Sequence, residues 1–150
     1  MTMPTWNPDY YLRLLTEVAQ TCEHLQAAPH VAAVARSPFV PADLARAAAA
    51  YAIFATFSRE TRDRWISGDL PWLSLAHAQA WPWSHALFLP VTPRQDLMTA
   101  VGYLLLEIER MDRDAMEDDE RAWLASEESK KARRAAAKNP DPDDFDVIED

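Results

Sequence analysis

Two carboxylates three residues apart, Glu109 and Asp112, have the spacing that points most directly to chemistry. Residues i and i+3 are neighbours on a helix, and two carboxylates so placed can hold a hard cation such as Mg²⁺. The helical repeat places Asp112 within an apolar stripe and Glu109 at its edge. A carboxylate facing a core is costly unless it is paired or metal-bound. The alternative is that Asp112 pairs with an arginine such as Arg46, or reaches solvent.

A magnesium site for nucleotide chemistry needs further carboxylates from other helices. Glu17, Glu23 and Asp43 are the available donors, although none belongs to a paired Glu-x-x-Glu motif. The predicted metal ligands are therefore Asp43, Glu109 and Asp112. No residue is predicted to be catalytic.

A segment rich in proline and tryptophan, residues 68–92, is the second candidate site. Prolines interrupt regular structure, whereas tryptophans favour burial and anchor many protein interfaces. The segment is therefore either an ordered loop packed on the helices or an exposed aromatic surface, and His77 and His85 are expected to hydrogen-bond within it. The predicted partner-binding residues are Trp72, Trp81 and Trp83, together with Phe145 and Ile148 near the C-terminus.

Residue patterns typical of helix N-termini predict where the helices in the rest of the chain begin. Asn7-Pro8-Asp9 predicts a helix over residues 8–26, and Pro41-Ala42-Asp43 predicts an alanine-rich helix that follows. Shorter helices are expected at 29–36, 59–66 and 72–80. Thr92-Pro93-Arg94-Gln95 predicts a capped long helix. Tyr103 and Leu106 make the other side of this helix apolar as well as its stripe, so we expect the first half to be buried almost all round. The stripe consists of Leu97, Val101, Leu104, Leu105, Ile108 and Met111.

Charge divides the chain unevenly. The net charge is −9, and residues 117–150 hold 12 of the 24 acidic residues. The end of the chain interleaves acids with few apolar residues, so it cannot bury enough surface to order itself. The predicted fold is all-α: a compact bundle of about four to five helices with an aromatic loop and a disordered acidic tail. The predicted boundary separates a helical domain, 1–126, from a charged, largely disordered tail, 127–150.

Composition excludes several classes of function. Only 2 glycines occur, so the chain has neither a dinucleotide-binding fingerprint nor a P-loop. The single cysteine, Cys22, allows no intrachain disulfide. No signal peptide is visible, and the longest apolar run, 47–57, is too short for a bilayer. We therefore expect a cytoplasmic protein without a membrane span. Its acidity disfavours direct nucleic-acid binding and suits a partner with a basic or apolar surface.

Five blocks of sequence, in this order, resemble a group of small proteins encoded by phages and prophages. They are 44–48 (LARAA), 51–52 (YA), 81–83 (WPW), 93–97 (PRQDL) and 107–113 (EIERMDR). The group's pattern reads approximately ELARAAxxYA, WPW, PRxDLxxA and AEIERLDR. The resemblance covers residues 43–113. The carboxylate-bearing helices of this group are in turn similar to those of the all-α MazG-like nucleotide pyrophosphohydrolases.

One departure from the group bears on function. Group members usually carry an acidic DDxH-like stretch before the alanine-rich helix, where this chain has RSPF at 36–39. If those acids bind metal, this chain has lost part of the site, which favours a binding role. The first hypothesis is thus a non-enzymatic phage or prophage accessory protein, without a cofactor, that binds and modulates a host defence or transcription component. The alternatives are a Mg²⁺-dependent MazG-like pyrophosphohydrolase and a structural subunit of a phage particle; a homo-oligomer is compatible with each.

Overall fold

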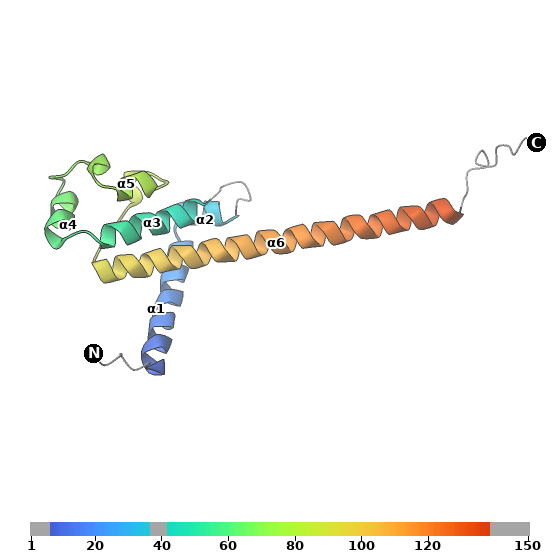
Figure 1. Ribbon diagram of the computed structural model, residues 1–150, viewed down its shortest axis with the longest axis horizontal. Coiled ribbons are helices and arrows are strands. Elements are labelled where there is room, and N and C mark those ends of the chain that lie inside the picture. The colour runs from blue at the N-terminus through green and yellow to red at the C-terminus, as the bar shows by residue number, and fades with distance from the viewer. Residues whose placement is uncertain (1–6, 37–41, 139–150) are drawn as a thin grey trace, which may run out of the picture. The chain divides into compact units, whose positions relative to one another are not determined.

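The computed structural model describes residues 7–36 and 42–138 (Figure 1). In these residues it contains six α-helices, two short 3₁₀ turns and no strand. The prediction of an all-α fold is confirmed. Among the described helices, none combines the length and apolar composition needed to cross a bilayer.

The first two helices begin where the sequence predicts. Helix α1, Pro8–Gln26, is capped by the Asn7 side chain, which accepts hydrogen bonds from the backbone N–H groups of Asp9 and Tyr10. Helix α2 spans Pro29–Arg36. Both helices have proline in the first turn, where its missing N–H costs no hydrogen bond.

Two helices form the middle of the fold. Helix α3, Asp43–Ala55, is rich in alanine, and its small side chains allow close packing of neighbouring elements. Its N-cap, Ala42, adopts a left-handed conformation with φ of 61°. Helix α4, Arg59–Ile66, begins after Ser58, whose hydroxyl accepts a hydrogen bond from the Thr61 N–H.

The Pro/Trp-rich segment folds into short turns packed on the helices. It contains a 3₁₀ turn, Trp72–Ser74, helix α5, His77–Ala80, and a second 3₁₀ turn, His85–Leu87. The indole of Trp81 is buried and donates to the Ser84 carbonyl at 2.9 Å. The structure thus resolves the two alternatives for this loop in favour of packing.

Helix α6, Pro93–Lys138, begins with the predicted cap. The Thr92 hydroxyl accepts from the Gln95 N–H at 3.2 Å and lies 3.0 Å from the Gln95 side-chain oxygen.

The expectation that the first half of α6 is buried almost all round was wrong. The six residues of the predicted core stripe are each 41–57% exposed, whereas Ala100, Tyr103 and Leu106 are buried. The side of the helix that carries Tyr103 and Leu106 faces the core, and the stripe does not.

The chain divides into two compact units, 1–111 and 112–150. In the second unit, residues 112–138 are helical and nearly all exposed, including Trp123 and Leu124. Salt bridges one turn apart, such as Arg121 with Asp118, occur along it. The helix therefore continues past the predicted boundary at 126. The acidic end with Phe145 and Ile148 lies outside the described residues.

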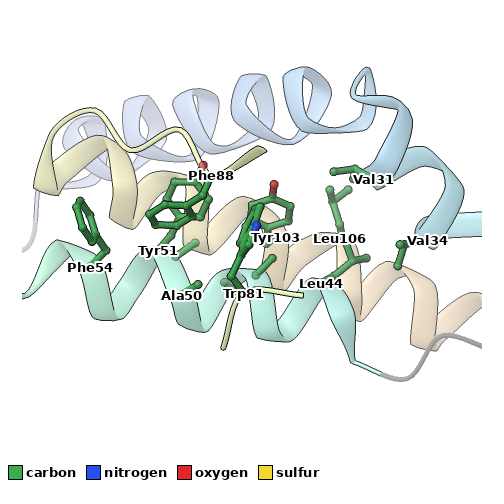
Figure 2. Close-up of a cluster of buried hydrophobic side chains, with 13 residues drawn as sticks. Val31, Val34, Leu44, Ala50, Tyr51, Phe54, Trp81, Phe88, Tyr103 and Leu106 are labelled. Atoms are coloured by element: carbon green, nitrogen blue, oxygen red, sulfur yellow. The ribbon is translucent and has the colours of Figure 1, made fainter. Parts of the chain in front are cut away.

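The core of the first unit is a cluster drawn from α2, α3, α6 and the Pro/Trp-rich segment (Figure 2). Aromatic rings dominate it. Tyr51 of α3 lies 4.5 Å from Phe88 and 5.9 Å from Tyr103, measured between ring centroids. Alanines of α3 fill the spaces between these rings, so the small and large residues interdigitate.

A buried ion pair joins α4 to the first turn of α6. The Arg62 guanidinium donates to the Asp96 carboxylate at 2.6 Å, and the two side chains are 4% and 1% exposed. Arg62 also donates to the Phe54 carbonyl at 2.9 Å, and Asp96 accepts from the Val91 N–H at 2.9 Å. These added hydrogen bonds satisfy both ions, which offsets the cost of removing them from water.

His77 is a buried base inside an aromatic box. Its ring is fully buried against Phe54, Trp65, Trp72 and Phe88. Neither ring nitrogen has a hydrogen-bond partner among the described residues, contrary to the expectation from the sequence. Burial lowers the pKa of His77 to about 4, so the ring is neutral at pH 7.

Replacing Asp96 with alanine should destabilise the fold by about 3 to 5 kcal/mol, because the Arg62 charge is left buried and unpaired. Chemical denaturation measures this difference. The control is Asp63→Ala on α4, whose partner Arg59 is exposed and 3.7 Å away; its effect should stay below about 1 kcal/mol. The double variant Arg62→Met, Asp96→Leu should recover part of the loss. Equal effects of the two aspartate variants would contradict a structural ion pair.

Acid should weaken the fold through His77. The unfolded chain binds a proton near pH 6.5, whereas the folded chain does so only near pH 4. Stability therefore falls as the pH decreases from 6.5 to 4, by about 3 kcal/mol in total. Measuring the free energy of unfolding of the native protein and of His77→Leu across this pH range tests whether His77 causes the loss of stability. The free-energy difference between the two proteins should change with pH, and parallel curves would show that His77 is not the group responsible.

Candidate functional site

An open groove of about 590 Å³ lies between α1, the segment 87–91 and the beginning of α6. Its volume is within the range of sites that take a small ligand or an anchoring side chain. The walls are mainly apolar. The residues that supply them are Leu25, Ala28, Leu87, Leu89, Val91 and Met98.

Two buried tyrosines line the base of the groove. Tyr51 and Tyr103 are 5% and 2% exposed. Both belong to the buried cluster shown in Figure 2. The Leu89 N–H donates to the Tyr51 oxygen at 3.1 Å, which ties the segment 87–91 to α3. Burial raises the pKa of each tyrosine, so both phenols stay protonated at neutral pH. They are hydrogen-bond donors in an apolar setting.

His30 adds a third polar group to the lining. Its Nε2 atom is buried and has no hydrogen-bond partner within the described part of the chain. The ring meets Trp83 edge to face, with centroids 4.8 Å apart. Burial lowers the pKa of His30, so the ring is neutral near pH 7.

Arg94 and Glu17 also line the groove. The Arg94 guanidinium donates to the Glu17 carboxylate at 2.8 Å, and the side chains are 59% and 47% exposed. This ion pair links α1 to the first turn of α6. A surface pair of this kind adds little stability, so either member is free to exchange its partner for a ligand.

The packing of α1 on α6 depends on a glycine. A Cβ atom at Gly102 would lie 2.9 Å from a methyl of Leu25 and 3.1 Å from Thr21. The Cys22 thiol lies 3.7 Å from the Gly102 carbonyl oxygen, to which it donates. Absence of a side chain at this position lets the α1 wall of the groove approach α6.

Two of the predicted metal ligands contact other side chains in the structure. Asp43 pairs with Arg46 at 3.6 Å, and Glu109 accepts from the Gln26 side chain at 3.5 Å. Asp112 is exposed and belongs to the second unit. In residues 7–36 and 42–138, no three side chains among His, Cys, Asp and Glu are grouped to hold a metal ion.

The three predicted tryptophans differ in accessibility. Trp81 is 5% exposed and belongs to the core, whereas Trp72 and Trp83 are partly buried. Trp72 packs on Trp65 and His77, while Trp83 contacts the groove residues His30 and Tyr103. Trp83 thus packs against two residues that line the groove, and it is more accessible than Trp81.

Sequence reasoning did not find the groove. Its lining comes from segments far apart in the chain, and Tyr51 and Tyr103 have the same pattern as ordinary core residues. The only local indication was His30, a histidine within a short helix of mostly apolar residues.

Comparison with known proteins found no similar protein. A scan against protein-family models, a search of curated proteins and a search of solved structures each gave no match.

Replacing Gly102 with leucine should push α1 away from α6 and open the groove. Overpacking of this kind costs about 1 to 3 kcal/mol. Hydrogen exchange should show faster exchange of the α1 amides, with little change in α3. Ala122→Leu, at an exposed position of the same helix, is the control. Unchanged protection of α1 in Gly102→Leu would show that this contact does not hold the wall.

Proposed function

We propose that this protein is a non-enzymatic accessory protein that binds another protein and modulates it. In line with the resemblance to small phage and prophage proteins, the partner is a host protein such as a defence or transcription component, met in the host cytoplasm. The observation that carries the binding role is the groove. It offers an apolar recess with polar groups inside it, as pockets for an interface anchor do.

The lining of the groove supports binding of an apolar anchor. Its volume of about 590 Å³ accommodates one large side chain and its neighbours. Leu87, Leu89 and Val91 are 39%, 71% and 64% exposed, so an occupant would remove apolar surface from water. The Tyr103 phenol and the His30 ring supply hydrogen-bonding groups that can fix the orientation of an occupant.

Charge favours a basic partner. The chain carries a net charge of −9, which attracts a positively charged surface over long range and raises the rate of encounter. Glu17, at the groove, can pair with a cationic residue next to the anchor. The expected ligand segment therefore combines one aromatic or large aliphatic residue with flanking lysine or arginine.

Selection of displayed random peptides on the purified protein tests this function. We expect enriched peptides to carry an aromatic or large aliphatic anchor beside basic residues. Thr99→Trp, on the α6 wall, should fill the groove and weaken their binding more than tenfold, which is about 1.4 kcal/mol. Ala49→Trp, at an exposed position of α3 outside the groove, is the matched control.

Titration of the selected peptides into the three proteins gives the answer, with circular dichroism to verify the fold. Binding that is lost in Thr99→Trp and kept in Ala49→Trp supports the groove as the docking site. Equal affinity for all three proteins would remove the groove from the account.

A further inference from the structure

Helix α6 has a second apolar face that its own domain does not cover. Within residues 97–111 this face is 41–57% exposed. Its members follow a spacing of four and three residues, and Leu105 widens the face on one side. They are Leu97, Val101, Leu104, Ile108 and Met111.

The core does not need this face. The domain packs against a different side of α6, where Asp96, Ala100, Tyr103 and Leu106 are buried. The alternating four-three spacing is that of a coiled-coil seam, in which another helix lies nearly along the first. The exposed face therefore has the geometry to receive a helix.

The exposed apolar face is large enough to form a protein–protein interface. It leaves on the order of 500 Å² of apolar surface in contact with water, near the upper end for a monomeric protein. Two such faces would bury about 1,000 Å² together, which is the size at which a specific interface begins. The face is about 22 Å long, at 1.5 Å per residue.

Within residues 97–111, few charged side chains border this face, and the exposed carboxylate of Asp112 lies just past its end. Two residues that flank the seam, Met98 and Leu105, are uncharged. On the other flank, the Glu107 carboxylate accepts two hydrogen bonds from Arg110, at 2.8 and 3.1 Å. The Glu107 carboxylate beside the seam is thus already paired.

We propose that the occupant of this face is the same face of a second copy, with the two α6 helices antiparallel. A two-fold dimer needs a self-complementary patch, and an apolar seam of fixed spacing meets that condition with itself. The antiparallel direction follows from charge. Residues 114–120 hold five acids, which a parallel pair would place side by side and an antiparallel pair keeps apart.

This inference is independent of the groove. None of the six exposed residues of the face lines the groove, so a partner can occupy the groove in either oligomeric state. The test of peptide binding at the groove and the test of dimerisation through this face can therefore fail separately.

Sedimentation velocity over a wide concentration range tests the dimer. The native protein should shift from monomer to dimer as its concentration rises, and Leu104→Glu and Ile108→Glu should stay monomeric with unchanged helicity. Leu73→Glu, at a 75% exposed position outside this face, should dimerise like the native protein. If a glutamate variant loses helicity, Leu104→Ser provides the milder disruption. A native monomer at every concentration, or a dimer insensitive to these changes, would overturn the proposal.

Cross-linking in a Cys22→Ala background tests the direction of the helices. A short bis-maleimide should join Leu97→Cys of one copy to Met111→Cys of another when the two variants are mixed. Met111→Cys alone should give no cross-linked dimer. Cross-linking between two copies of Met111→Cys would instead show parallel helices.

Discussion

The buried ion pair between Arg62 and Asp96 determines how α6 is rotated in the fold. Asp96 lies in the first turn of α6 and must face Arg62, because either charge alone would be buried without a partner. The helical repeat then carries the same side of α6 through Ala100 and Tyr103 into the core. It also turns Leu104 and its stripe away from the core. One electrostatic contact thus decides which of two apolar faces the domain covers.

The groove depends on the same contact. Asp96 accepts from the Val91 N–H, and Tyr51 accepts from the Leu89 N–H, so the segment 87–91 is held at both α6 and α3. Tyr103, two turns after Asp96, reaches the base of the groove because of the rotation that Asp96 imposes. The absence of a side chain at Gly102 then admits α1 as the remaining wall. The residues that stabilise the fold therefore also hold the walls of the groove in place.

Much of the fold could be predicted from local patterns. The caps at Asn7 and Thr92 fixed the beginnings of α1 and α6, because capping depends on residues within one turn. The side of α6 that faces the core was not predictable in this way. Periodicity reveals an apolar stripe but not which of two stripes is covered, and Asp96 reads as a surface residue until Arg62, 34 positions earlier, is placed beside it. The groove escaped prediction for the same reason, since its lining is assembled from distant segments.

The rotation of α6 is the central claim, and hydroxyl-radical footprinting of the native protein tests it most directly. At low concentration, Leu104, Ile108 and Met111 should be oxidised readily, while Leu106, which is 3% exposed, stays protected. At high concentration the first three should become protected as well. Equal oxidation of Leu104 and Leu106 in the dilute protein would show that α6 is not held in this rotation, and the account of both the groove and the dimer face would fail with it.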